Sequence, residues 1–133
     1  MEDCIFCKIA AGVIPSDRVF EDERVFAFRD IHPLAPTHIL IIPKKHYASL
    51  IELDEKDQPL MGYLLHVANR LAEQEGIAGK GYRVAINCGP QGGQVVQHVH
   101  VHLLGGRELG GSWDKLNCPC WRPERLAKAS GEC

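Results

Sequence analysis

Apolar residues recur every three or four positions between residues 57 and 76, and this period predicts one long helix. Either Asp54 or Asp57 is a suitable N-cap, and Pro59 is tolerated in the first turn. Gly76 is suited to end the helix. The stripe expected to face the core comprises Leu60, Met61, Leu64, Leu65, Ala68, Leu71 and Ala72.

The chain before this helix is patterned mainly for strands. A short helix is expected at residues 4–11, before a glycine. Residues 19–21 and 25–29 flank a polar turn, and the second run alternates with a period of two, which indicates a hairpin. Residues 38–42 are apolar on both faces, so we expect a central strand that ends at Pro43.

Alternation returns after the long helix at residues 82–88 and 97–104, the last two expected strands. Residues 89–93 between them form a glycine-rich loop. Beyond residue 105 the composition shifts to glycine, proline, tryptophan and cysteine without clear periodicity. We therefore divide the chain into a domain at residues 1–107 and a C-terminal tail of unknown role at residues 108–133.

The length and charge of the chain exclude several classes of protein. Its 133 residues suffice for one hydrophobic core, and 45% hydrophobic and 24% charged residues are typical of globular proteins. Fifteen basic and seventeen acidic residues leave no basic stripe, so we expect no nucleic-acid partner. The longest aliphatic run, residues 39–42, is too short for a membrane span, and the acidic start does not resemble a secretory signal. We expect a cytoplasmic protein without a membrane partner.

Three of the seven histidines fall within five residues. On a strand, residues two apart share a face, so His98, His100 and His102 are expected to project together while Val99 and Val101 face the core. The cluster is an ordinary polar surface, a metal site or a catalytic site. A neutral imidazole suits nucleophilic attack at phosphorus because it carries no negative charge. The adjacent glycine-rich loop is suited to present backbone N–H groups to a phosphate.

Residues 98–104, HVHVHLL, fit the signature His-φ-His-φ-His-φ-φ, in which φ is apolar. The chain thereby resembles the histidine triad (HIT) family of nucleotide hydrolases and transferases, most closely its Hint-like branch of purine nucleoside phosphoramidases. The likeness runs from Ile5 to Arg107 through the blocks FED (20–22), FRDI (28–31), APTH (35–38), IPKKH (42–46), GYR (81–83), GGQ (92–94) and GGR (105–107).

The resemblance implies an α+β, HIT-like fold, with a five-stranded antiparallel sheet and one long and one short helix, that pairs into a homodimer. It also implies roles for four histidines. His100 matches the nucleophile, oriented by the backbone carbonyl of His98, while His102 and His38 match the groups that hold the phosphate and protonate the leaving amine.

The resemblance further implies a nucleotide-binding set. Asp30 matches the carboxylate that receives the ribose hydroxyls. Val95 stands where Hint-like sequences often have a serine, and its side chain lacks a hydrogen-bond donor. The remaining matches are Asn87, Gly93 and Gln94 on the phosphate side, and Phe6, Ile9, Ile14, Phe28 and Ile31 in an apolar cleft for the base.

Cys4 and Cys7 have the spacing of a C-x₂-C metal motif. A redox pair or two buried cysteines are the alternatives. Several HIT-related proteins bind zinc through the equivalents of Cys4, Cys7, His46 and His98, so we expect a structural zinc site and no organic cofactor. We expect Cys118 and Cys120 to be free thiols, with a second metal site as the alternative.

These observations favour a hydrolase that cleaves the phosphorus–nitrogen bond of purine nucleoside 5′-phosphoramidates, such as adenosine 5′-phosphoramidate, through nucleotidyl-His100. Dinucleoside polyphosphate hydrolysis and nucleotidyl transfer are alternatives within the family. A zinc-stabilised nucleotide-binding module without useful catalysis is a third, and a catalytic metal centre of His98, His100 and His102 is a fourth.

Overall fold

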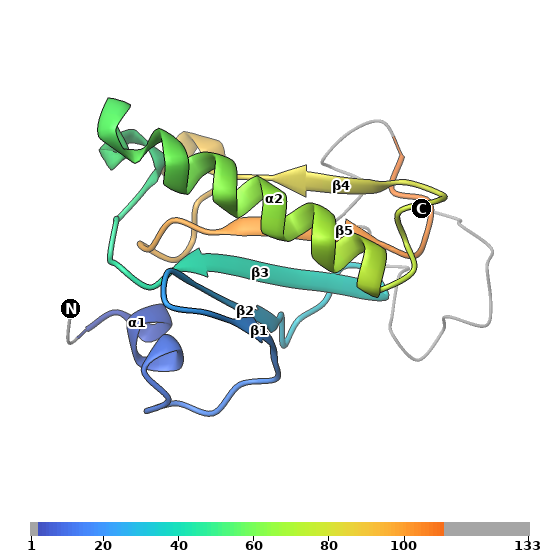
Figure 1. Ribbon diagram of the computed structural model, residues 1–133, viewed down its shortest axis with the longest axis horizontal. Helices are drawn as coiled ribbons and strands as arrows, with labels where there is room; N and C mark the ends of the chain where they lie inside the picture. Colours follow the sequence, from blue (N-terminus) through green and yellow to red (C-terminus); the bar gives the residue numbers. More distant parts are fainter. Residues whose placement is uncertain (1–2, 111–133) are drawn as a thin grey trace.

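The computed structural model describes residues 3–110, which form a five-stranded antiparallel sheet packed against one long helix (Figure 1). The elements are α1 (Ile5–Ala10), β1 (Arg18–Glu21), β2 (Val25–Arg29), β3 (Thr37–Pro43), α2 (Gln58–Gln74), β4 (Tyr82–Ala85) and β5 (Val101–Gly105), with short 3₁₀ turns η1 (Leu50–Glu52), η2 (Glu55–Asp57) and η3 (Pro90–Gly92). The strand order is β1-β2-β3-β5-β4, so the apolar strand β3 is central as expected. The predicted α+β architecture is confirmed.

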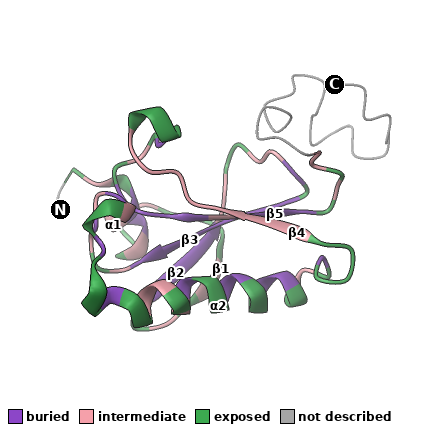
Figure 2. Cartoon of the chain, turned by 90° about the horizontal axis from the view of Figure 1, so that it is seen from above, coloured by how far each residue is buried: buried purple, intermediate pink, exposed green. Residues whose placement is uncertain are grey.

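Alternate residues of the strands cover the two faces of the sheet. Helix α2 lies along one face (Figure 2), where it packs on the set Val25, Ala27, Ile39, Ile41, Val101 and Leu103. The opposite face carries Phe26, Phe28, Leu40 and Ile42, which pack with Phe6 and Ile9 of α1. His102 pairs with Leu40 across β5 and β3, and therefore belongs to the second face. The sheet thus separates a helix-covered core from a face that carries histidine.

Helix α2 buries a slightly different stripe from the one its sequence predicts. Leu64, Ala68, Leu71 and Ala72 are buried as expected. Leu65 is 46% exposed, whereas Val67, which the predicted stripe omitted, is buried. The positions around Leu64, Val67 and Leu71 follow the three-and-four spacing that faces the sheet, and Leu65 lies outside it.

The predicted last strand is shorter than its alternating pattern, because β5 begins only at Val101. In register with β3, Ile41 pairs with Val101, so Pro43 would lie opposite Val99. Pro43 has no N–H to donate to the ladder, and the N–H of Val99 donates instead to the carbonyl of Tyr47 at 2.7 Å. His98 and His100 therefore belong to an irregular segment, and the prediction of one strand over residues 97–104 is wrong there.

Strand β4 is also shorter than the expected residues 82–88. Its last pair is Ala85 with His102, one residue after β5 begins, so the partner strand limits the length of β4.

No helix in the described part of the chain has the length and apolar content needed to cross a lipid bilayer. Most of the tail predicted at 108–133, including Cys118, Cys120 and Cys133, lies outside the described residues, and its boundary remains a prediction.

Gly105 is required by close packing at the end of β5. A Cβ atom there would lie 2.6 Å from Ile77 Cδ1 and 3.2 Å from Ile77 Cβ. We therefore expect Gly105→Ala to lower the free energy of unfolding by about 1–3 kcal/mol in urea titrations. The matched control is Gly79→Ala, where nothing lies within 4 Å of the added Cβ. Equal stability of the two variants would contradict this packing constraint.

Candidate functional site

His100 lies at the centre of the candidate site, and only 6% of its surface is exposed. Its Nδ1 lies 2.7 Å from the backbone carbonyl oxygen of His98. A carbonyl can only accept, so Nδ1 carries the hydrogen and the neutral ring keeps its lone pair on Nε2. Burial lowers the pKa of His100, which favours this neutral form. The ring therefore has the protonation state that a nucleophile requires.

The side chain of His98 takes no part in the hydrogen bond between its own backbone carbonyl and His100. Its Nε2–H donates to the backbone oxygen of Pro43 at 2.8 Å, which leaves the lone pair on Nδ1. This Nδ1 lies 3.2 Å from Cys4 Sγ and 3.5 Å from Cys7 Sγ. One residue thus contributes its carbonyl to His100 and its ring to a pair of cysteines.

His46 completes a group of four metal-ligating side chains. Its Nδ1 lies 3.4 Å from Cys7 Sγ and 3.2 Å from His98 Nδ1. Ligands of a tetrahedral zinc ion lie about 3.5 Å apart for sulfur and nitrogen and about 3.3 Å apart for two nitrogens, given the usual bond lengths. The donor set and its spacing therefore fit zinc.

The cysteines of this group are positioned by α1. Cys4 is its N-cap, and its Sγ accepts the backbone N–H of Cys7 at 3.3 Å. Burial and the neighbouring Cys4 raise the pKa of the Cys7 thiol, and a divalent cation between the two sulfurs would offset both effects.

His38 and His102 form a hydrogen-bonded pair beside His100. The backbone N–H of Leu34 donates to His38 Nδ1 at 3.1 Å, so His38 carries its hydrogen on Nε2. That Nε2–H donates to His102 Nδ1 at 3.0 Å, which places the hydrogen of His102 on Nε2. The centroids of the His102 and His100 rings lie 4.8 Å apart. The pair thus ends in an N–H group next to the expected nucleophile.

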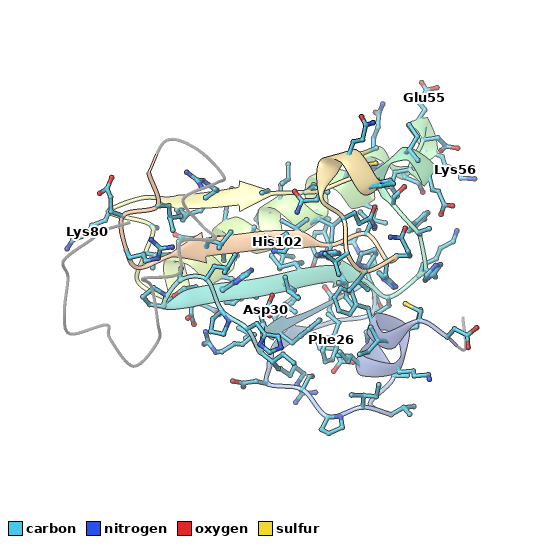
Figure 3. All side chains as sticks on the ribbon, turned by 180° about the vertical axis from the view of Figure 1, so that it is seen from behind. Phe26, Asp30, Glu55, Lys56, Lys80 and His102 are labelled. Atoms are coloured by element: carbon cyan, nitrogen blue, oxygen red, sulfur yellow. The ribbon has the colours of Figure 1, made fainter. Side chains whose placement is uncertain are left out.

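Burial is the largest cause that lowers the pKa of both histidines of this pair, and for His102 the value is about 3. The neighbouring rings of His100 and His38 lower the pKa of His102 further. Asp30 Oδ2 lies 3.6 Å from His38 Nε2, and Asp30 Oδ1 accepts the N–H of His32. Figure 3 shows Asp30 and His102 on the face opposite α2.

The described residues do not support a metal centre made of the three neighbouring histidines. Potential metal-binding atoms converge in two sets, one with His98 and the cysteines and one with Asp30, His38 and His102. His100 belongs to neither set. The second set is already joined by the hydrogen bond between His38 and His102.

The residues expected to line the base cleft are only partly brought together. Phe6 packs edge-on against Phe28 at 5.4 Å and against His100 at 5.2 Å between ring centroids. Ile9 is buried in the same cluster, and Ile14 packs against it. Ile31, in contrast, is 85% exposed. The cluster therefore packs against the ring of His100 through Phe6, and Ile31 alone among the five is open to solvent.

The residues expected at the phosphate lie on the loop that contains η3. Asn87 is partly buried after β4, and Val95 is 87% exposed. Gly93 has a φ of 83°, a conformation that favours glycine, and its N–H donates to Pro90 at 3.2 Å. A phosphate would share this N–H in a three-centre bond. Gln94 is buried, unlike the neighbours expected to act with it.

The family resemblance named the carbonyl of His98, but sequence reasoning missed the other two backbone groups that set the protonation of these rings. The carbonyls of His98 and Pro43 and the N–H of Leu34 select one nitrogen on each of three histidines. No side chain marks such groups in a sequence. The proline that ends β3 was the one available signal.

Comparisons with known proteins agree with this geometry. The HIT domain family model matches residues 11–109. A 14 kDa zinc-binding protein of Zea mays is 56% identical over 107 residues, 79% of this chain and 83% of that protein. A purine nucleoside phosphoramidase of Escherichia coli K12 is 50% identical over 109 residues, 82% and 92% of the two chains.

Two further proteins show the same similarity. An adenylylsulfatase of Arabidopsis thaliana is 50% identical over 107 residues, 79% of this chain and 72% of that protein. The crystal structure of a HIT family hydrolase from Legionella pneumophila superposes with a TM-score of 0.81 at 50% identity. The superposition covers 85% of this chain and 99% of that one.

The low pKa of His102 predicts a loss of stability in acid. An unfolded histidine has a pKa of about 6.5, whereas that of folded His102 is about 3. Between these two pH values the unfolded chain binds a proton at residue 102 that the folded chain does not bind. The free energy of unfolding should therefore fall as the pH decreases from 7 to 5. We expect His102→Asn to reduce this slope by roughly 1 kcal/mol per pH unit in urea titrations at the two pH values. Identical slopes in the two proteins would contradict a His102 ring that stays neutral in the folded chain.

Proposed function

The chain belongs to the HIT domain family, and we propose that it hydrolyses the phosphorus–nitrogen bond of purine nucleoside 5′-phosphoramidates through a nucleotidyl-His100 intermediate. The observation that carries this proposal is the bond between His100 Nδ1 and the carbonyl of His98 at 2.7 Å, which leaves the Nε2 lone pair available. The identity with the Escherichia coli phosphoramidase supports the choice of substrate.

The first step forms one bond and breaks another. The lone pair of His100 Nε2 attacks the α-phosphorus, and the bond from phosphorus to the amine nitrogen breaks with its electron pair on nitrogen. The amine nitrogen takes a proton from solvent as it leaves, and the Nε2–H of His102, whose other nitrogen accepts from His38, is suited to donate a hydrogen bond to that nitrogen. The His100 ring becomes positively charged, and the carbonyl of His98 stabilises that charge through Nδ1–H.

Water completes the reaction. Its oxygen attacks phosphorus, the bond to His100 Nε2 breaks with its electron pair on nitrogen, and the proton of the water passes to solvent, which replaces the proton taken up by the amine. The products are a nucleoside monophosphate and an amine. Asp30, as an acceptor beside His38, is suited to receive the ribose hydroxyls. Asn87, the Gly93 N–H and the backbone of Val95 are proposed to contact the phosphate, and Val95 adds no hydroxyl to them.

A second leaving group deserves measurement because of the Arabidopsis relative named an adenylylsulfatase. Sulfate leaves as a stable anion and needs no proton, whereas an amine does. The N–H of His102, at the end of the pair with His38, therefore favours the amide as substrate. Dinucleoside polyphosphate hydrolysis and nucleotidyl transfer use the same nucleophile and differ in the leaving group or in the acceptor.

Replacing His100 tests the proposal against a module that only binds nucleotides. We expect His100→Ala to lower the turnover of adenosine 5′-phosphoramidate and adenylyl sulfate by at least about 10⁴-fold, because the nucleophile is lost. Intact-mass measurement after an acid quench should show one added AMP on the wild-type chain and none on the variant. His66→Ala, on the exposed side of α2, is the control.

Binding of AMP by the wild-type chain without adduct or turnover would support the binding module and contradict the enzyme.

We also propose that Cys4, Cys7, His46 and His98 hold a structural zinc ion, since their donor atoms lie within 4.8 Å of one another. The ion would supply stiffness to the segment that carries His100, with no part in the bond changes. The zinc-binding maize relative supports this.

Metal analysis tests the zinc site. Protein purified without added metal should contain about one zinc per chain, and the double variant Cys4→Ser/Cys7→Ser should contain none and melt at a lower temperature. Cys88→Ser, at a free cysteine outside the group, should keep the metal. Zinc missing from the wild-type chain would reject the site. A chelator should leave activity intact until this ion is lost.

The homodimer is a further part of the proposal. Strand β4 is at one edge of the described sheet, and Tyr82–Ala85 are all partly exposed. An edge strand offers unpaired backbone groups to a second chain. Leu65 on α2 adds an exposed apolar side chain. These features support pairing through α2 and the edge strand.

A further inference from the structure

Gln94 is unusual for its place in the chain. It is 7% exposed, although the preceding residues 91–93 and the following Val95 are exposed. An amide side chain is costly to bury unless its polar atoms find partners. Because Gln94 is buried in an otherwise exposed loop, its amide group requires hydrogen-bond partners within the protein.

The side chain of Gln94 is fully hydrogen-bonded within the protein. Its Oε1 accepts the N–H of Gly89 at 2.9 Å. Its Nε2 has two hydrogens, and it donates to the carbonyls of Ala48 at 2.7 Å and Val96 at 2.9 Å. The backbone N–H of Gln94 donates to the Gly89 carbonyl at 3.0 Å. The expected direct contact of Gln94 with a phosphate would therefore require one of these bonds to break.

The bond to Ala48 connects the loop to a segment with two other attachments. In residues 46–48, the ring of His46 belongs to the cysteine group. The carbonyl of Tyr47 accepts the N–H of Val99, the residue between His98 and His100, at 2.7 Å. The carbonyl of Ala48 accepts from Gln94. His46, Tyr47 and Ala48 thus contact, in that order, the cysteine group, the segment of residues 98–100 and the loop of residues 89–94.

This segment is itself held in place. The N–H of Ala48 donates to Glu52 Oε1 at 2.7 Å, and the hydroxyl of Tyr47 donates to Asp57 Oδ1 at 3.0 Å. Asp57 also accepts the N–H of Asp54 in the capping box before α2. The segment of residues 46–48, which holds the loop through Ala48, is therefore anchored to the start of the long helix α2.

We propose that Gln94 is a positioning residue, which closes the loop of residues 89–94 and sets its distance from His100 through Ala48. The inference rests on the proposed function, because the loop matters as the group that meets the α-phosphate while His100 attacks it. Displacement by about 1 Å is enough to cost about 10²-fold in rate. Gln94 acts on the phosphate through the loop.

The test compares a ligand that has a phosphate with one that lacks it. Calorimetry measures the affinity for AMP and for adenosine in the wild-type chain and in Gln94→Ala, Gln94→Glu and Gln91→Ala. Gln94→Ala removes all three side-chain bonds. Gln94→Glu is nearly isosteric and still accepts from Gly89, but the carboxylate cannot donate to Ala48 and Val96. Gln91→Ala changes an exposed side chain of the same loop.

We expect both Gln94 variants to bind AMP about tenfold or more weakly while their affinity for adenosine is unchanged. The value of kcat/KM for adenosine 5′-phosphoramidate should fall with them, and Gln91→Ala should match the wild type. Equal losses for AMP and adenosine would overturn the proposal, because they would indicate a general structural role. Unchanged AMP affinity in Gln94→Glu would also overturn it.

Hydrogen exchange separates this inference from the proposed function. Amides of Gly89 and of residues 92–94 should exchange faster in Gln94→Ala than in the wild type, whatever the substrate. If the wild-type chain binds neither AMP nor adenosine, the proposed function fails while this measurement still tests the closure of the loop. Unchanged exchange in the variant would overturn the positioning role.

Discussion

The hydrogen bond from His100 Nδ1 to the carbonyl of His98 is the constraint on which the arrangement of the site depends. It is buried and 2.7 Å long, so competition from water is small and the ring is held in one orientation and one tautomer. The ring of His98 faces the cysteines because its Nε2–H is taken by Pro43. The end of β3 thereby orients His98 so that its ring faces the two cysteines while its carbonyl faces His100.

Burial keeps these rings neutral at a cost in acid stability. Desolvation lowers the pKa of His38, His100 and His102, and the largest effect is on His102. A neutral imidazole has a lone pair, which an imidazolium lacks, so burial supplies the reactive form at neutral pH. Apolar side chains such as Phe6, in edge contact with His100, provide this environment. Packing of α1 on the sheet is therefore part of the chemistry.

Local patterns predicted most of the fold. The three-and-four period located α2, alternation located β2, and a run apolar on both faces located the central strand β3. The error at residues 97–100 has a physical cause, because the alternating pattern continues where Pro43 can no longer support a ladder. The histidines and cysteines of the site were identified from their spacing and from the family resemblance. Neither the tautomer of His38, which the N–H of Leu34 fixes, nor the hydrogen bonds that hold Gln94 were predicted. Both depend on backbone groups that only the fold brings together.

The tautomer of His100 is the most direct test of the account. Long-range nitrogen–proton NMR correlation on ¹⁵N-histidine-labelled protein at pH 7 distinguishes a protonated ring nitrogen from one with a lone pair. We expect a hydrogen on Nδ1 and a lone pair on Nε2 of His100. A hydrogen on Nε2, in the neutral ring or in an imidazolium, would contradict it.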